Sequence, residues 1–150
     1  MRFVGLLVAV ALFPAPLALA ANLDSKILDA TQIAALESKA LQAAPREQCF
    51  IYAELVHSMT EIAGQQMQSG NMEKASVALQ SAKSYAEKIH MGLANDTKKL
   101  KNAEILIRHT AFRLKAYLSG ASLDDRPTLE ATLKQLDQVQ SELMMQVFKH

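Results

Sequence analysis

The sequence predicts an all-α protein, an up-down antiparallel bundle of four long helices with or without a further helical arm at the N-terminal side. Good helix formers (Ala, Leu, Gln, Lys, Glu and Met) dominate the chain after residue 20, and runs of β-branched residues are missing. Glycine and proline fall at a few separated positions that divide this part into five segments. In most segments apolar residues recur every three or four positions, as in an amphipathic helix.

Residues 1–20 have the three parts of a secretory signal peptide. Arg2 supplies a basic start, an apolar run covers 3–13, and prolines precede an Ala-Leu-Ala cleavage pattern that ends at Ala20. The run is shorter than the roughly 20 residues of a membrane span, which disfavours an uncleaved anchor; a buried core helix is the other alternative. We therefore expect cleavage after Ala20, a periplasmic or secreted protein, and no stable membrane insertion after cleavage.

Residues 21–150 are expected to form a single helical-bundle domain, because this length suits one hydrophobic core. The whole chain has 16 Lys and Arg and 15 Asp and Glu, so removal of Arg2 leaves 15 of each. A zero formal net charge argues against a nucleic-acid partner, since such proteins usually carry a basic excess. Cys49 is the single cysteine, which excludes an internal disulfide. We expect a buried thiol; a reactive thiol or an intermolecular disulfide is the alternative.

Caps and helix breakers set the bounds of the five segments. Asp29 and Gln32 match a capping box, although the first helix could also begin at 24 or 25. Pro45 suits a first helical position and Gly70 a C-terminal cap. The expected segments cover about 24–43, 45–69, 72–93, from the turn at Asn95 and Asp96 to 119, and from a cap among Ser122, Asp124 and Asp125, with Pro127 in the first turn, to the C-terminus.

Four segments carry an apolar stripe that must be buried, because isolated helices are marginal in water. The stripes comprise Tyr52, Leu55, Val56, Met59, Ile62 and Ala63; Ala75, Leu79, Ala82, Ala86, Ile89 and Leu93; Leu100, Ala103, Ile107, Leu114 and Leu118; and Leu129, Leu133, Leu136, Leu143 and Val147. Short connections make sequential helices antiparallel neighbours. The alternative fold is a set of tetratricopeptide-like helical hairpins, but only 45–93 matches one such unit.

A repeated Glu-x-x-His pattern predicts, as one alternative, a di-iron-like centre that would hold iron or another divalent metal. It occurs at Glu54 and His57 and again at Glu87 and His90. If the second and third segments fold back at residue 70, the two motifs lie level, and Glu37 and Glu104 come to a similar height. The helical phase opposes this interpretation, because it turns most of these side chains, together with Glu61, away from the apolar faces. We therefore favour solvated polar faces and no cofactor.

Motifs of several enzyme classes are missing from the sequence. It has no phosphate-binding glycine loop, no dinucleotide-binding glycine pattern, no Gly-x-Ser-x-Gly elbow and no His-Glu-x-x-His. Whether the protein is an enzyme stays open, with non-enzymatic action favoured.

One face of the fourth segment is the best candidate for a partner-binding surface. Lys101, Arg108 and Lys115 repeat every seven residues, with Ile105 and Phe112 beside them. A basic face with an apolar edge suits an acidic partner helix or an anionic surface. The interpretation that we favour instead has Ile105 and Phe112 packed on another helix, because a central bundle helix buries more than one face. The charges are then solvated, with Arg108 paired to the glutamate four positions earlier.

The sequence thus favours an exported helical bundle that acts as a non-enzymatic protein-interaction or structural module with an unidentified protein partner. Self-association is a further expectation, because the leucine seam of the last segment resembles a coiled-coil interface that Gln140 interrupts. Six methionines after residue 20 are scattered, which favours filling of gaps in the core over a flexible binding surface.

Overall fold

The computed structural model describes residues 27–89 and 97–149 of the chain, and this part contains five α-helices and no strand. The helices are α1 (Ala30–Gln42), α2 (Pro45–Gln68), α3 (Met72–Glu87), α4 (Thr97–Ser119) and α5 (Arg126–Phe148). They pack against one another, which confirms the predicted all-α bundle of four long helices with an N-terminal helical arm. None of the described helices is long and apolar enough to cross a membrane.

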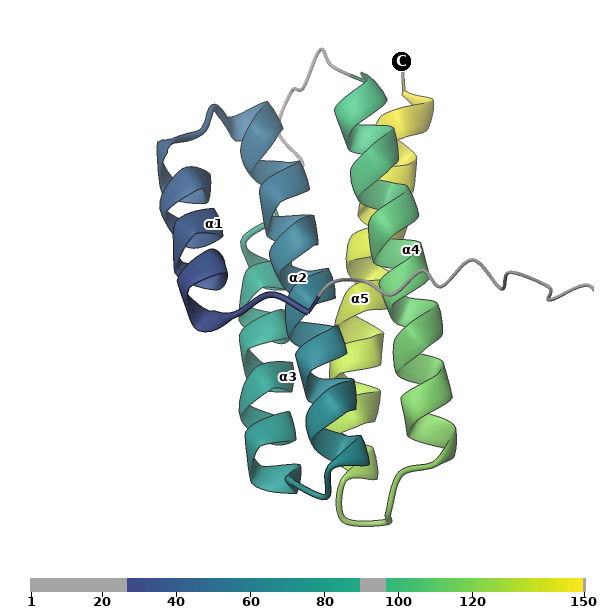
Figure 1. Cartoon of the computed structure of the whole chain (residues 1–150). Coiled ribbons are helices and arrows are strands. Elements are labelled where there is room, and N and C mark those ends of the chain that lie inside the picture. The colour runs from purple at the N-terminus through teal and green to yellow at the C-terminus, as the bar shows by residue number, and fades with distance from the viewer. Residues whose placement is uncertain (1–26, 90–96, 150) are drawn as a thin grey trace, which may run out of the picture.

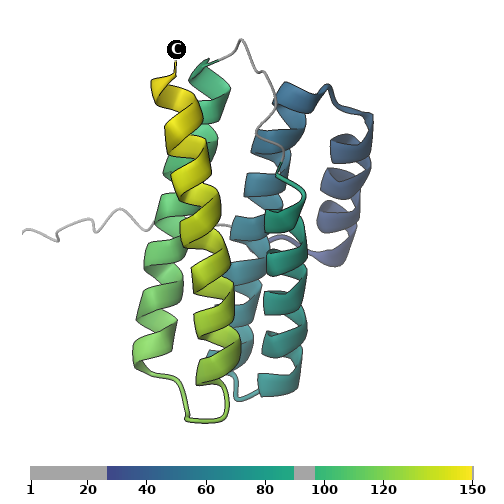
Figure 2. The same cartoon turned by 180° about the vertical axis from the view of Figure 1, so that it is seen from behind.

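Two antiparallel hairpins, α2–α3 and α4–α5, lie side by side (Figure 1). Helix α2 runs along α4, and α3 runs along α5, as the view from behind also shows (Figure 2). Helix α1 lies outside the bundle against α2. Among the described residues α3 and α4 make no contact, so these sequential helices are diagonal and not neighbours as expected. Helices α2 and α4 are therefore parallel partners, and this pairing positions most of the polar side chains discussed below.

The predicted signals act at the start of α1 and in the first turns of α2 and α5, whereas Asp125, which precedes α5, makes no side-chain cap hydrogen bond. The side chain of Asp29 accepts the Gln32 N–H at 2.8 Å and the Asp29 N–H donates to the Gln32 side chain at 3.1 Å, a full capping box. Pro45 takes a first-turn position of α2, and Pro127 does so in α5. Residues 24–26 lie outside the described residues, and the start at Ala30 agrees with the Asp29 alternative.

The turn between α2 and α3 depends on Gly70, whose φ of +75° disfavours other residues. The Gly70 N–H donates to the Met67 carbonyl at 3.0 Å and the Asn71 N–H donates to the Gln66 carbonyl at 2.8 Å. This pair of bonds is a Schellman motif, which confirms the predicted glycine cap. It reverses the chain and places Met67 and Met72 on opposite sides of a tight turn.

Helix α3 ends at Glu87, so the expected extension to 93 is wrong. The N–H groups of Lys88 and Ile89 donate to the carbonyls of Tyr85 and Ala86, three residues earlier, at 3.0 and 3.2 Å. Such bonds tighten the last turn and close the helix. Ile89 still packs in the core at 6 % exposure, and Leu93 lies outside the described residues.

The predicted stripes form the core. Its largest fully buried apolar side chains come from α2, α3, α4 and α5: Leu55, Val56, Leu79, Leu100, Ile107, Leu114, Leu129, Leu136 and Leu143. The leucine seam of α5 is part of this core, so it packs against the other helices of the same chain. Cys49 is 1 % exposed, and burial raises the pKa of its thiol to about 11, which confirms the predicted buried thiol.

Candidate functional site

The five side chains predicted to bind a partner all lie on the solvent side of α4. Lys101 is exposed, as are Ile105 (43 %) and Phe112 (70 %), while the side chains of Arg108 and Lys115 are more than half exposed. We call these five residues the outer face of α4. The favoured interpretation, that Ile105 and Phe112 pack on another helix, is wrong, because both side chains are exposed.

Two ion pairs border the outer face of α4. The Arg108 guanidinium lies 3.8 Å from the carboxylate of Glu104, four residues earlier, as the sequence predicts. The Lys115 ammonium lies 3.8 Å from the Asp137 carboxylate on α5, and both side chains are at least half exposed. An exposed pair such as Lys115–Asp137 contributes at most about 1 kcal/mol, so it leaves Lys115 available to a second acidic group. In the other pair the Glu104 side chain is buried, but the Arg108 side chain is 58 % exposed and can also reach a second acidic group.

A second group of exposed apolar side chains lies near the C-terminal end of α5. Met144, Met145 and Phe148 are exposed there, Phe148 by 81 %. With Ser141 and Lys149 they line a shallow hollow of about 520 Å³.

The structure separates the described members of the predicted metal set. Glu54 is half-buried; burial raises its pKa, and the nearby charge of Lys39 on α1 opposes this. His57 points to α4, Glu87 is exposed on α3, and His90 lies outside the described residues. Among the described residues no group of three or more His, Cys, Asp or Glu side chains could hold a metal ion. The four-residue set stays a prediction, and native mass spectrometry of protein made in metal-replete medium tests it.

The two further carboxylates expected at that level also face different neighbours. Glu37 on α1 accepts a hydrogen bond from the Tyr85 hydroxyl of α3, which ties the outer helix to the bundle. Glu104 on α4 is 8 % exposed and accepts a 3.4 Å hydrogen bond from the Gln140 side chain of α5. Gln140 interrupts the leucine seam of α5 because it faces this buried carboxylate.

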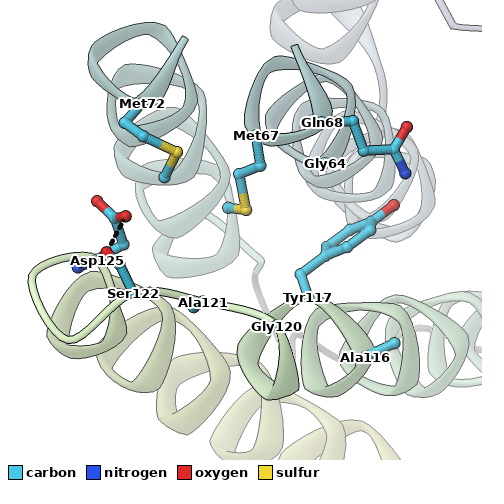
Figure 3. A pocket seen from close by; sticks show the side chains of 10 residues that line it. All are labelled: Gly64, Met67, Gln68, Met72, Ala116, Tyr117, Gly120, Ala121, Ser122 and Asp125. Carbon is cyan, nitrogen blue, oxygen red and sulfur yellow. Dashed lines mark hydrogen bonds between the residues drawn. The ribbon is translucent and has the colours of Figure 1, made fainter. Parts of the chain in front are cut away.

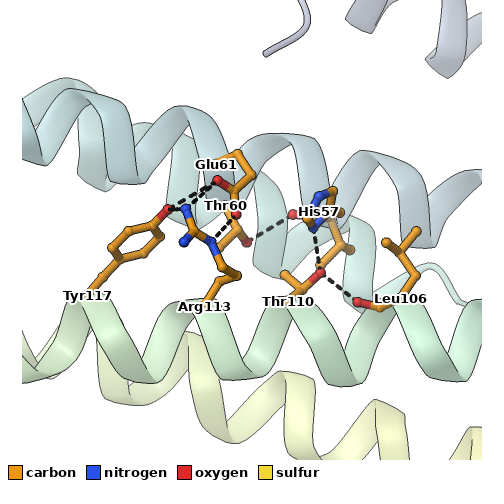
Figure 4. Close-up of polar contacts among 8 residues, drawn as sticks. His57, Thr60, Glu61, Leu106, Thr110, Arg113 and Tyr117 are labelled. Carbon is orange, nitrogen blue, oxygen red and sulfur yellow. Dashed lines mark hydrogen bonds and ion pairs between the residues drawn. The ribbon is translucent and has the colours of Figure 1, made fainter. Parts of the chain in front are cut away.

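A line of polar contacts joins α2 to α4 (Figure 4). His57 Nδ1 lies 2.9 Å from the Thr110 hydroxyl oxygen, and the Thr110 hydroxyl donates to the Leu106 carbonyl at 2.8 Å. Because the hydroxyl proton is used in the second bond, Nδ1 of His57 carries the proton of the first. The His57 ring also lies 5.6 Å from the ring of His109, measured between centroids.

One turn further along, Glu61 of α2 meets Arg113 and Tyr117 of α4. The guanidinium of Arg113 donates two hydrogen bonds of 2.9 Å to the two carboxylate oxygens of Glu61. The Tyr117 hydroxyl accepts from Arg113 at 2.8 Å and donates to Glu61 at 3.2 Å. Glu61 is only 8 % exposed, so the expected solvated position of this carboxylate is wrong. A two-bond Arg–carboxylate pair fixes orientation as well as charge.

These contacts shift the pKa values of the groups involved. Burial alone would raise the pKa of Glu61, but the hydrogen bonds and charge of Arg113 outweigh it and hold that pKa below its ordinary value. Burial lowers the pKa of His57, His109 and Arg113 add to this, and Glu61 opposes it. Burial and the charge of Glu61 raise the pKa of Tyr117. At neutral pH the cluster therefore holds an ionised Glu61, a cationic Arg113 and a neutral Tyr117.

Because Gly64 has no side chain, Tyr117 has room to reach Glu61 and Arg113. A Cβ atom built on Gly64 would lie only 2.2 Å from the Tyr117 ring, far inside a normal contact distance. The Arg113 guanidinium covers the Tyr117 ring at 5.2 Å from its centroid. Since these side chains satisfy one another, the inner face of α4, formed by Thr110, Arg113 and Tyr117, sets the register between α2 and α4.

Tyr117 also lines a pocket at the end of the bundle that carries the α2–α3 turn (Figure 3). This pocket has a volume of about 490 Å³ and is lined in part by Gly64, Met67, Met72, Ser122 and Asp125.

The pocket and the polar cluster were both missed by sequence reasoning. The chain offered one usable signal, the small residue Gly64 beside Glu61 in a helix.

Comparison with known proteins assigns no family or function to this chain. No protein-family model matches the chain, and no curated protein or solved structure matches it significantly.

Proposed function

We propose that this protein, after export, acts as a non-enzymatic interaction module, and that the outer face of α4 binds an acidic amphipathic helix of a partner protein. The observation that carries this proposal is the 70 % exposure of Phe112 on a well-packed helix. Aromatic side chains and arginine are enriched among the residues that dominate binding at protein interfaces.

The arrangement of the outer face of α4 argues for the chemistry of the partner. Ile105 and Phe112 lie two helical turns apart and form an apolar ridge, with Lys101, Arg108 and Lys115 along one side. An amphipathic helix recognises a partner through apolar anchors at such spacings. From Lys101 to Lys115 the surface is about 21 Å long at 1.5 Å per residue, enough for a partner helix of about four turns. Glutamates beside the apolar anchors of that helix would meet the three cations.

Site-directed photo-crosslinking in the cell tests this proposal. The full-length chain carries p-benzoylphenylalanine in place of Phe112, or in place of Val77 as a matched control. Val77 is 60 % exposed on α3, a helix that does not touch α4 among the described residues.

Irradiation should join the probe at 112 to an acidic amphipathic segment of another protein, identified by mass spectrometry of the crosslinked peptide, and the probe at 77 should not form this product. Equal products from both positions would contradict the proposal. A product that contains only two copies of this chain would show that the occupant is a second copy.

A further inference from the structure

The pocket at the end of the bundle lies between the two turns that close the hairpins, the α2–α3 turn and the α4–α5 connection (Figure 3). Its volume of about 490 Å³ lies within the range of small-molecule sites, about 300–1,000 Å³. A smaller hollow of about 140 Å³ adjoins it, shares Met67, Met72 and Asp125, and continues inward to Leu79 and Leu129. The pocket therefore has a mouth at the turns and a smaller inner part that is lined by both apolar and polar side chains.

The walls of the pocket are apolar and adaptable. Met67 and Met72 point their thioether groups into it from the two sides of the Gly70 turn, and the ring of Tyr117 forms the wall on the α4 side (Figure 3). Methionine side chains are flexible and polarizable and adjust to chains of different shape. An alkyl chain that lies here would contact these side chains, and removal of its apolar surface from water would be favourable.

The charge of the pocket has one sign. Asp125 lines both hollows and Asp124 lines the smaller one, whereas no Lys, Arg or His is among the described residues that line either. Asp125 precedes the first residue of α5, a position where aspartate usually accepts a helix N–H. Here its side chain accepts no such bond; it accepts the hydroxyl of Ser122 at the pocket wall instead. Asp125 thus lies among the residues that line the pocket, with Ser122 holding its carboxylate.

We propose that this pocket binds a primary alkylammonium ion, with its charged end on Asp125 and its alkyl chain between Met67, Met72 and Tyr117. A carboxylate beside apolar walls disfavours anions, and a purely apolar ligand would bury the carboxylate without compensation. An ammonium group supplies hydrogen-bond donors that match a carboxylate and a hydroxyl oxygen. This site shares no residue with the outer face of α4, so it stands or falls independently of the interaction proposed above.

Methionine-methyl NMR tests the proposal directly, because the methionines report separate positions. Protein labelled with ¹³C at the methionine methyl groups is titrated with hexylammonium, 1-hexanol and hexanoate, which share a chain and differ in charge. Met67 and Met72 signals should shift saturably, while Met144 and Met145 on α5 stay unchanged. Hexylammonium should bind about tenfold more tightly than hexanol, and hexanoate more weakly still. Equal affinities for the three compounds, no saturable shift, or shifts centred on Met144 and Met145 would overturn the proposal.

Substitution at Asp125 then separates the charge from the cavity. Asp125→Asn should lower the affinity for hexylammonium about tenfold, to that of hexanol, and leave the hexanol affinity unchanged. Asp137→Asn is the matched control, because Asp137 is an exposed aspartate of α5 that lines neither hollow. Unchanged hexanol binding shows that the pocket of the Asp125 variant is intact. Wild-type affinity for hexylammonium in Asp125→Asn, or an equal loss in Asp137→Asn, would refute the assignment.

Discussion

Helix α4 has two faces built from similar residue types, one of which packs against α2 while the other is exposed to solvent. On the inner face, Arg113 and Tyr117 satisfy a buried carboxylate of α2, and each polar group of the Glu61 cluster finds a partner within the chain. On the outer face, Arg108 and Phe112 point to solvent. The difference teaches that a cation and an aromatic residue on a helix identify a candidate binding surface only where no other helix of the same protein covers them.

The comparison makes a separable prediction for each face. Substitutions on the inner face should change the free energy of unfolding, and substitutions on the outer face should change binding with little effect on folding.

Arg113→Leu should have the largest effect on stability. It leaves the carboxylate of Glu61 buried with only the Tyr117 hydroxyl as a donor in this cluster. Breaking a buried pair costs about 3–5 kcal/mol, and we expect about 2 kcal/mol here because the Arg113 side chain is 40 % exposed. Urea denaturation measures this change, with Lys115→Leu as the outer-face control expected within about 0.5 kcal/mol. Equal losses in both variants would erase the distinction between the faces.

Gly64→Ala should destabilise the protein by about 1 kcal/mol, because the new methyl group displaces Tyr117 from Glu61 and Arg113. In a Tyr117→Ala background the same substitution should instead stabilise the protein by about 0.5–1 kcal/mol, since alanine favours a helix over glycine. A double-mutant cycle from four denaturation curves checks this change of sign. Additive effects would show that Gly64 and Tyr117 are not coupled.

The pH dependence of stability should include a contribution from His57. Its pKa is lowered in the folded protein, so near pH 6 the unfolded chain binds more protons than the folded one. Stability should therefore fall as the pH drops below the ordinary value of 6.5, with a slope of at most about 1.4 kcal/mol per pH unit from one proton. His57→Gln should flatten the curve of unfolding free energy between pH 5 and about 6.5. If the unfolding free energy of His57→Gln depends on pH as that of the parent does, the folded protein does not hold the pKa of His57 below its ordinary value.

Phe112→Ser should have the smallest effect on folding, within about 0.5 kcal/mol by urea denaturation, because the side chain is 70 % exposed. A loss of about 3 kcal/mol or more, the range for removal of a core aromatic side chain, would place Phe112 in a packed interface of the chain itself.

Most of the fold could be predicted from the periodicity of apolar residues and from the helix caps. The apolar stripes, the Asp29 capping box, the Gly70 turn and the end of α4 at Ser119 follow from local sequence and are confirmed. The end of α3 at Glu87 did not follow, because apolar residues continue beyond it in helical phase. The diagonal placement of α3 and α4 also escaped prediction, since a stripe shows that a helix is buried without showing against which partner.

The candidate site was predictable only where it concerns one helix. The phase of α4 placed Lys101, Ile105, Arg108, Phe112 and Lys115 on a common face, and this placement is confirmed. Glu61 looked solvated because it lies opposite the apolar stripe of α2. That helix is central, however, and α4 covers its polar side with Arg113 and Tyr117. The pocket is formed by two turns that are far apart in the sequence, so no local sequence pattern predicts it.

The most direct test of the proposed function is the crosslinking yield of the probe at 112 in a chain with Lys101→Glu, Arg108→Glu and Lys115→Glu. The matched triple variant has Lys74→Glu, Lys83→Glu and Lys134→Glu, exposed cations on α3 and α5. We predict that reversal on the outer face of α4 lowers the yield by about tenfold or more, since like charges would meet an acidic helix. The matched variant should crosslink as the parent does. An equal yield in all three chains would contradict the claim that the outer face of α4 selects an acidic partner.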